Sequence, residues 1–391
     1  MSTPSLADSK SCVGCMACRD TCKYGAISLA MGKDGHFYIK VDSLKCVGCK
    51  QCERICKKIQ SRDYADNVKS SIPYCVYNPN VLDNPFSTSG AMFPAIARFF
   101  LENDGVVYGA SFKTDKIHVE CRRIDDSKDL PLLQGSKYQQ SDMSGIYLAI
   151  ADDLRQGRRV LFSGLGCQTA AVLAYFDRNE NNNNLYTVDI VCGGVSSSLL
   201  TDTFVKENRV KGIISYREKA KYQLTYINGD GEVVKSKRNL PLSGFESMLT
   251  NRYSCYDCKF AGLRRHSDFT IGDYWGDKHK DGKVRSLCIC HSERAKKLFK
   301  ELDIEEEKLS WSFVYDNPRV ADGYCPFGKR YERTHIDDIF ARCSYKTLMK
   351  IYASDIRKTD FFWMLYKLYR VLCYRRFRKD SINRIKKIIE I

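Results

Sequence analysis

The chain has 391 residues, of which 43% are hydrophobic, a share that is ordinary for a globular protein. This length predicts two or three domains, and the longest apolar run, Ala170 to Phe176, is far too short to span a membrane. The first ten residues lack the apolar core of a secretory signal, so we expect a cytoplasmic protein whose 19 cysteines stay reduced.

The net charge of +16 is concentrated at the two ends of the chain. Residues 10–62 hold 11 Lys/Arg against 4 Asp/Glu, and residues 344–391 hold 13 against 4, so these ends carry the whole excess. A pI near 9.0 raises nucleic-acid binding as an alternative. Because no RNA-binding motif accompanies the charge, we expect no nucleic-acid partner.

The first 60 residues contain the spacing C-x2-C-x2-C-x3-C twice. One such loop wraps three corners of a [4Fe-4S] cube, and the fourth Cys of each run ligates the other cluster. Disulfides do not suit a reducing compartment, and zinc sites usually pair two C-x-x-C knuckles without the further cysteines. The pattern resembles bacterial two-cluster ferredoxins, with Lys23 and Lys57 where those proteins usually carry Pro. We assign cluster I to Cys12, Cys15, Cys18 and Cys56, and cluster II to Cys46, Cys49, Cys52 and Cys22.

We expect this ferredoxin module to occupy residues 1–60, with a strand at 35–41 between its two halves. A polar linker at 61–71 separates it from a mixed α/β domain over 72–335. The overall class is therefore α+β or α/β, with several domains.

The N-terminal part of the second domain, 72–210, alternates strands and helices, which is typical of a parallel or mixed sheet. A turn rich in hydroxyl residues, Ser87 to Ser89, precedes its first helix, and we expect one of the three to cap that helix. Pro94 fits only within the first turn of the helix. Strands are predicted at 105–112, 117–121, 159–162 and 185–191, and helices at 91–101 and 146–154.

The C-terminal part, 211–335, has an α+β pattern. A hairpin over 222–234 turns on Asn228-Gly-Asp-Gly231. Two strands, at 268–275 and 285–290, and a helix at 293–302 follow it.

The tail, 344–391, is basic and has a helical period of apolar residues. Such a helix either packs on its own domain or lies peripherally at the inner face of a membrane, with Trp363 at headgroup depth. The apolar residues that recur at helical spacing are Phe361, Phe362, Leu365, Leu368, Tyr369 and Leu372.

Five short motifs of the second domain carry a resemblance through their order and spacing. The chain over about 10–335 resembles the coenzyme F420 hydrogenase/dehydrogenase beta-subunit family, in the forms with a fused ferredoxin module. The motifs are Gly135-Ser-Lys-Tyr138, Cys167, Cys192-Gly-Gly-Val-Ser196, Cys255-x-x-Cys258 and Ile271-Gly-Asp-Tyr-Trp-Gly276.

The resemblance implies FAD beside the iron–sulfur clusters. A helix N-terminus with small hydroxyl residues suits a pyrophosphate, and Lys137 would place a positive charge near a phosphate or a reduced flavin. Taken alone, the Gly-Ser-Lys-Tyr motif predicts a surface turn. The segments that match flavin contacts comprise Ser87, Thr88, Ser89 and Gly90 together with Gly135, Ser136, Lys137 and Tyr138.

The resemblance also implies a third [4Fe-4S] cluster, held by Cys255 and Cys258. Alone, this pair is equally a structural thiol pair or half a zinc knuckle. Cys167 and Cys192 are the expected further ligands, because each follows a predicted strand, an arrangement that would allow both to lie at one sheet edge. Cys288 and Cys290 are rival ligands, although their apolar neighbours favour a place in the core. Cysteines without a spacing partner are expected to be buried thiols: Cys75, Cys121, Cys325, Cys343 and Cys373.

Two departures from the family bear on the chemistry. Leu165-Gly166 stand where the family usually has Thr-Pro, and Gly193 stands where it usually has His. The missing ring donor leaves the catalytic residue unassigned, and we expect Asp273 of the Gly-Asp-aromatic-Trp motif to be a structural hydrogen-bonding residue.

These observations predict an iron–sulfur flavoprotein oxidoreductase. Electrons would pass between an external carrier, the clusters and FAD, with hydride transfer to or from an organic substrate that resembles F420 or another ring. The basic ferredoxin module predicts an acidic carrier protein. The alternative is an electron-transfer subunit of a larger redox complex without a substrate of its own.

Overall fold

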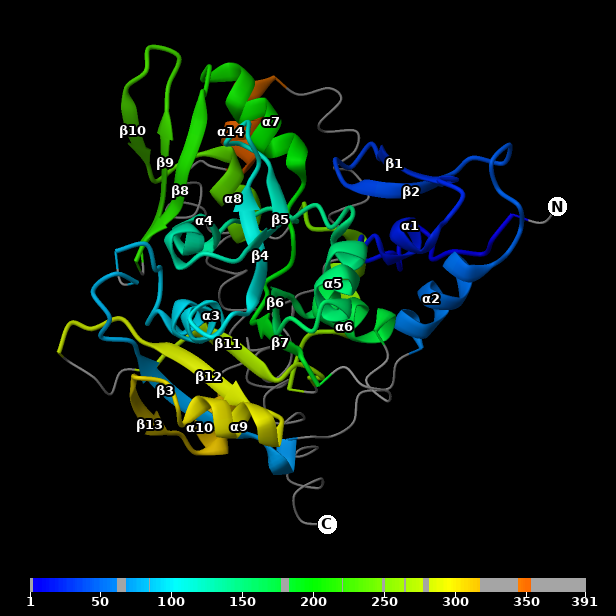
Figure 1. Ribbon diagram of the computed structural model, residues 1–391. Coiled ribbons are helices and arrows are strands. Elements are labelled where there is room, and N and C mark those ends of the chain that lie inside the picture. The colour runs from blue at the N-terminus through cyan, green and yellow to red at the C-terminus, as the bar shows by residue number, and fades with distance from the viewer. Residues whose placement is uncertain are drawn as a thin grey trace.

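The structure is a computed structural model of the chain, and its mixed α/β architecture confirms the predicted class (Figure 1). It consists of a ferredoxin-like module, a large mixed sheet with helices on both faces, and a smaller antiparallel sheet. Only α14 (Tyr345–Tyr352) of the basic tail is described, so the apolar stripe from Phe361 to Leu372 lies outside the described residues. The structure describes residues 3–61, 68–83, 85–176, 183–219, 221–247, 250–263, 265–276, 281–316 and 344–352.

The large sheet has eight strands, and its four central strands, β11, β7, β6 and β4, run parallel. The outer strands join antiparallel on both sides. Strands from both sides of residue 210 belong to this sheet, so the subdivision that we expected at 210 is not a boundary of the sheet. In spatial order the strands are β13 (Glu305–Lys308), β3 (Ile72–Tyr77), β12 (Ser286–Cys290), β11 (Phe269–Asp273), β7 (Leu185–Ile190), β6 (Val160–Leu165), β4 (Val106–Phe112) and β5 (Val119–Ile124).

Both faces of this sheet are buried, which explains the continuous apolar runs of its central strands. On β4, Val106 and Tyr108 face one core while Val107 faces the other, as the two-residue period of a strand requires. The first core is closed by α5 (Ile146–Arg155) and α6 (Gly166–Tyr175). The second is closed by α3 (Met92–Leu101), α4 (Leu130–Leu133) and α9 (Glu293–Phe299).

The ferredoxin-like module lies against the α5 and α6 face (Figure 1). Its strands pair as an antiparallel hairpin, and the predicted strand at 35–41 is β2. Buried Val13, Met16 and Ala17 join the same core as α5 and α6, so the module is part of the packed domain. Its elements are α1 (Ala17–Thr21), β1 (Ile27–Met31), β2 (Phe37–Val41) and α2 (Gln51–Gln60).

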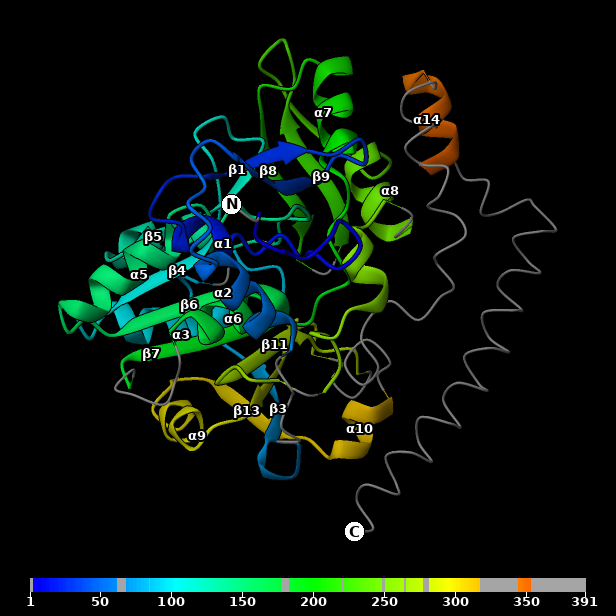
Figure 2. The same ribbon diagram turned by 90° about the vertical axis from the view of Figure 1, so that its right-hand side faces the viewer.

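The smaller sheet contains the predicted hairpin and packs on two helices. β8 (Gly212–Glu218), β9 (Lys221–Ile227) and β10 (Val233–Ser236) are all antiparallel. Figure 2 shows α7 (Ser198–Glu207) and α8 (Leu240–Ser247) beside this sheet, with α14 packed on them. None of the helices in the described part of the chain is long and apolar enough to cross a bilayer.

Candidate cluster sites and an adjoining cavity

The two N-terminal cysteine loops have the same backbone conformation. Gly14 and Met16 have φ of 67° and 63°, and the corresponding Gly48 and Lys50 have φ of 71° and 59°. These left-handed residues stand on either side of Cys15 and Cys49. Left-handed backbone turns the chain sharply, and non-glycine residues adopt it only at a free-energy cost. The two loops therefore share a conformation in which each loop bends around its own cluster site.

The structure gathers the eight cysteines into two sets of four. Cys22, Cys46, Cys49 and Cys52 line one small cavity. The other set is Cys12, Cys15, Cys18 and Cys56. Burial raises the pKa of the Cys18 thiol, and the three other thiols of this set lie close enough to raise it further. The last cysteine of each run therefore lies with the first three of the other run. This is the arrangement that two cubes require, and thiolate ligation would release protons from these thiols.

The sheet topology brings four further cysteines together. Cys167 lies at the start of α6, directly after β6, and Cys192 follows β7. β6 and β7 are parallel neighbours, so their carboxyl ends meet at one edge. Cys255 lies in a short 3-10 helix, Tyr253–Asp257, and Cys258 directly follows it. All four line one cavity of about 200 Å3.

Close backbone packing forms the walls of this inner site. A Cβ on Gly166 would stand 2.6 Å from the carbonyl oxygen of Phe260, and one on Gly194, whose φ is 100°, would stand 2.3 Å from Nδ2 of Asn251. Both positions therefore require glycine. The Leu165-Gly166 departure from the family thus has a structural reason, because Gly166 permits the approach of the segment that carries Cys258.

The donor chemistry of the inner site fits a [4Fe-4S] cluster. Burial raises the pKa of Cys192 to about 11. Burial also raises the pKa of Cys167 well above its usual value, and the thiols of Cys258, Cys192 and Cys255 add to this effect. Four converging thiols are the ligand set of zinc or an iron–sulfur cube. A cube is larger than one ion and keeps its four sulfur ligands farther apart, so a cavity of about 200 Å3 that all four cysteines line suits the cube.

The other described cysteines are core residues. Cys288 and Cys290 are fully buried on β12 among the apolar side chains of α3 and α9, which excludes these rivals from the inner cavity. Cys75 and Cys121 are buried as well. Cys325, Cys343 and Cys373 lie outside the described residues.

A buried arginine joins the cluster I loop to the inner site. Arg252 is 1% exposed and donates from Nη1 to the carbonyl of Cys12 (3.2 Å) and from Nη2 to that of Phe37 (2.6 Å). Ser254 Oγ donates to the same Cys12 carbonyl at 3.1 Å, and Tyr147 OH donates to the Cys15 carbonyl at 2.7 Å. Cys15, Cys167 and Cys258 pack against one hydrophobic core. The two candidate sites are therefore neighbours in the fold.

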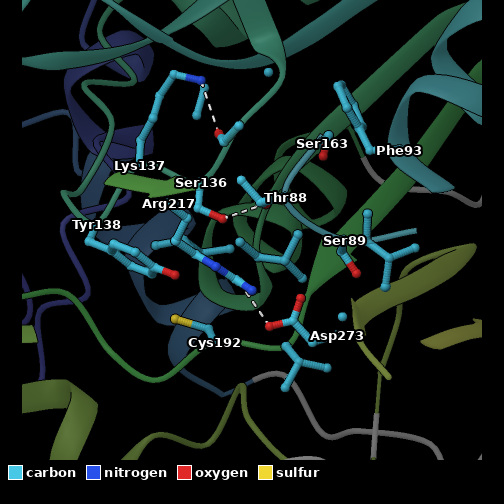
Figure 3. Close-up of a pocket in the computed structure, with 18 of the residues that line it drawn as sticks. Thr88, Ser89, Phe93, Ser136, Lys137, Tyr138, Ser163, Cys192, Arg217 and Asp273 are labelled. Atoms are coloured by element: carbon cyan, nitrogen blue, oxygen red, sulfur yellow. Dashed lines mark hydrogen bonds and ion pairs between the residues drawn. The ribbon is translucent and has the colours of Figure 1, made fainter. Parts of the chain in front are cut away.

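A second cavity, of about 290 Å3, adjoins the inner site (Figure 3). The turn around Thr88 and the loop around Ser136 meet there, and their hydroxyls are 2.9 Å apart. The remaining walls come from the ends of β6, β7 and β11, and from β8, β9 and α8. Leu165, Cys192, Gly193, Gly194 and Val195 line both cavities and form a shared wall. The structure thus brings the two segments that resemble flavin contacts into one cleft beside the inner cysteines.

The predicted cap of the helix after this turn is wrong. α3 begins after Ala91, whose φ is 58°, and no side chain caps it. Ser87 Oγ instead donates to the carbonyl of Asp83, just before the turn, and Ser89 Oγ donates to that of Arg285 in a distant segment. Pro94 lies in the first turn of α3, as predicted.

Lys137 lies at the edge of the cavity, where Nζ donates to the carbonyls of Gln134 (2.8 Å) and Gly135 (3.2 Å) of its own loop. Burial lowers its pKa to about 7. Tyr138 stacks on Phe245 with ring centroids 4.0 Å apart and also contacts Tyr222. The Gly-Ser-Lys-Tyr loop is therefore anchored by its aromatic ring and presents a readily titrated amine.

Sequence reasoning missed Arg217, which lies in the same cavity. Its Nη1 is 2.9 Å from Oδ2 of Asp273, and its guanidinium stacks 5.0 Å from the Tyr222 ring centroid (Figure 3). Asp273 is therefore the partner of a buried cation, in agreement with its expected structural role. Arg217 is on β8 of the smaller sheet, and no motif links it to β11, so only the tertiary structure could reveal the pair.

The site defines an iron–sulfur electron-transfer protein, and comparison with known proteins gives its family. Residues 11–58 match the model of the 4Fe-4S dicluster domain, and residues 157–311 match that of the C-terminal region of the coenzyme F420 hydrogenase/dehydrogenase beta subunit. Residues 157–311 thus resemble the C-terminal region of that oxidoreductase family, and they are fused to a dicluster domain, which confirms the predicted resemblance. The turn at Thr88 and the loop at Ser136 lie between the two matched segments.

Several solved structures match the chain, and one of them is similar over much of its length. It is an F420-reducing [NiFe] hydrogenase complex from Methanosarcina barkeri, which aligns over 69% of this chain and 90% of its own at 16% identity, with a TM-score of 0.44. No curated protein matches this sequence.

Proposed function

We propose that the protein is an iron–sulfur flavoprotein oxidoreductase that carries electrons between an external carrier and an organic substrate, with three [4Fe-4S] clusters and one FAD as cofactors. The observation that carries this proposal is a continuous series of sites. The cluster I loop is bonded to the segment of Cys255, and the wall from Cys192 to Val195 separates the inner cysteines from the cavity. When bound, FAD supplies hydride exchange joined to single-electron transfer.

The cavity residues suit a dinucleotide flavin. The hydroxyls of Thr88 and Ser136 offer hydrogen bonds to polar groups, and Gly135, at φ 80°, leaves the loop backbone accessible. Apolar and aromatic side chains such as Phe93, Ile190 and Tyr138 offer surfaces for a ring system. Ser87, Ser89 and Gly90 fix the turn through bonds to Asp83, Arg285 and Ser286, and so act by holding Thr88 in place.

The charged side chains of the cavity have two different roles. Arg217 and Asp273 neutralise each other, so neither presents an unpaired buried charge. Lys137, with its lowered pKa, takes up a proton when an anionic group approaches it. This residue therefore holds the charge that favours a phosphate or an anionic reduced ring.

The alternative is an electron-transfer subunit that feeds a larger partner. Gly193 supports it, because the family's usual ring donor is missing from the wall of the cavity. The two functions are separated by substrate-dependent reoxidation of the bound flavin in the isolated chain, which only the oxidoreductase with its own substrate would show.

Cofactor content tests the proposal directly. Anaerobically reconstituted protein should contain about twelve iron and twelve sulfide per chain, since each cube holds four of both. It should also release one FAD. If the fully loaded protein contains only eight iron, the proposed inner cluster is ruled out. If the protein cannot be loaded with flavin, the proposed FAD is ruled out.

A further inference from the structure

We propose that the cluster II loop, residues 42–50, together with Lys23 and Tyr24 forms the docking surface for a small acidic one-electron carrier protein. The inference rests on the proposed function only in requiring that the N-terminal module carries its clusters. It specifies which of the two N-terminal sites exchanges electrons with the carrier, and through which residues.

The first observation is exposure. Cys49 is the one exposed thiol among the described cysteines, although it belongs to a set of candidate ligands. Three large apolar side chains of the same segments are also exposed: Leu44 is 97% exposed, Tyr24 54% and Val47 43%. Tyr24 and Val47 line the same small cavity as Cys22, Cys46, Cys49 and Cys52. An electron that leaves or enters cluster II therefore crosses no further layer of protein at this edge.

The second observation is charge. Lys23, Lys45 and Lys50 are all exposed, and each is the sequence neighbour of a cluster II cysteine. No acidic residue occurs between 43 and 52 or between 21 and 33. Asp42 is only partly exposed, and it accepts a hydrogen bond from the backbone N–H of Leu44. An apolar centre within a cationic rim is the surface that an acidic protein complements, since the charges steer the encounter and the apolar contact holds it.

The third observation concerns cluster I, which a carrier protein cannot approach as closely. The cluster I loop is covered, because Arg252 and Ser254 bind the Cys12 carbonyl and Tyr147 binds that of Cys15. Cys15 packs against the core beneath α5 and α6. Figure 1 shows the segment between β2 and α2 at the outer edge of the module, away from the large sheet. Cluster I therefore faces inward, and cluster II is the site that a carrier reaches.

The test uses the reconstituted full chain and a reduced acidic ferredoxin as the probe. Stopped-flow absorbance follows reduction of the N-terminal clusters, a readout that does not depend on FAD or on the inner cluster. The triple variant Lys23→Glu/Lys45→Glu/Lys50→Glu is compared with Lys297→Glu/Lys300→Glu/Lys308→Glu, whose lysines are exposed on and beside α9 and on β13. Both variants lower the net charge by the same six units, so they differ only in where the charge is reversed.

We expect the second-order rate constant to fall at least tenfold in the first variant at low salt and less than twofold in the second. The wild-type rate should also fall steeply as salt rises. A third variant, Leu44→Asp, should slow transfer while it leaves all three lysines in place. Equal effects of the two triple variants, or a wild-type rate insensitive to salt, would overturn the docking surface. An iron content equal to that of the wild type in every variant verifies that the module is intact, and failure of the inner cluster or of FAD would leave this outcome unchanged.

Discussion

The two N-terminal cluster sites and the inner site have the same kind of ligands but are built in opposite ways. The eight N-terminal cysteines come from two short contiguous runs, and one of them, Cys49, reaches the surface. The inner four come from three separate segments, which meet because β6 and β7 are parallel neighbours. The inner cavity also has Arg265 on its wall, a buried cation that forms an ion pair with Asp189.

This difference shows what each site is suited to do. A local loop keeps its ligand geometry even at an exposed edge, so it can meet a partner. The inner site depends on the pairing of strands in the large sheet and shares a wall with the cavity. In the proposed function, electron entry and substrate chemistry are thereby kept at opposite ends of one series of sites.

Removing one cysteine of the inner site should interrupt electron transfer along the series of sites. Cys255→Ala is expected to lower the iron content from about twelve to about eight per chain and to slow electron transfer from the module to bound flavin at least a hundredfold, since a cube needs four thiolates. FAD should still bind. Rapid-mixing spectroscopy and iron analysis measure both effects. The matched control is Cys121→Ala, a buried thiol on β5 that lines neither cavity and should change neither quantity. Flavin reduction at the wild-type rate in Cys255→Ala would exclude a role for the inner cluster.

Loosening the contact between the two kinds of site should slow transfer without removing a cluster. Arg252→Met leaves the carbonyls of Cys12 and Phe37 without this donor, which we expect to cost about 3 kcal/mol of stability and to slow transfer from cluster I to the inner site roughly tenfold. Anaerobic denaturation and laser-triggered reduction measure these effects. Arg155→Met, at an exposed arginine on α5, serves as the control. An unchanged transfer rate in a destabilised Arg252→Met protein would show that the arginine only supports the fold.

The affinity of the cavity for FAD should depend on pH through the protonation of Lys137. Its pKa of about 7 rises when an anionic ligand binds, so FAD binding takes up a proton. Between pH 7 and the pKa of the bound state, affinity should therefore weaken by up to tenfold per pH unit as pH rises. Fluorescence titration of FAD-depleted protein measures this slope. Lys137→Met should bind FAD with an affinity that is nearly independent of pH over this range, and equal slopes in the two proteins would contradict a charge contact with the ligand.

The smallest expected effect concerns the potential of the inner cluster. A fixed positive charge stabilises the reduced, more negative cluster, so Arg265→Gln should lower its reduction potential by roughly 50 mV, the size of one unit charge at a high effective protein dielectric. Arg265→Lys keeps the charge and should restore most of the potential. Redox titration followed by electron paramagnetic resonance measures the shift. The N-terminal clusters provide an internal control, and a parallel shift of all three clusters would indicate a general structural change.

The sequence alone determined the N-terminal module, because cluster ligation there is a matter of short spacing. The crossing of Cys22 and Cys56 between the two sets followed from the same pattern. Most strands were also predictable, since the central strands of the sheet are apolar runs bounded by turns. The fully buried thiols Cys288 and Cys290 were rightly favoured as core residues from their apolar neighbours.

Only the tertiary structure decided how the remaining parts meet. The resemblance had suggested the set Cys167, Cys192, Cys255 and Cys258. Strand order cannot be obtained from local pattern, so only the structure shows that the parallel pairing of β6 and β7 brings these cysteines to one cavity. The helix cap was predicted wrongly because Ser87 and Ser89 bond to residues that a local rule does not include. The Arg217–Asp273 pair joins two sheets, and Arg252 joins the module to the segment of Cys255. Long-range contacts of this kind depend on packing of the whole chain, whereas the spacing of a ligand loop is fixed by a few neighbouring residues.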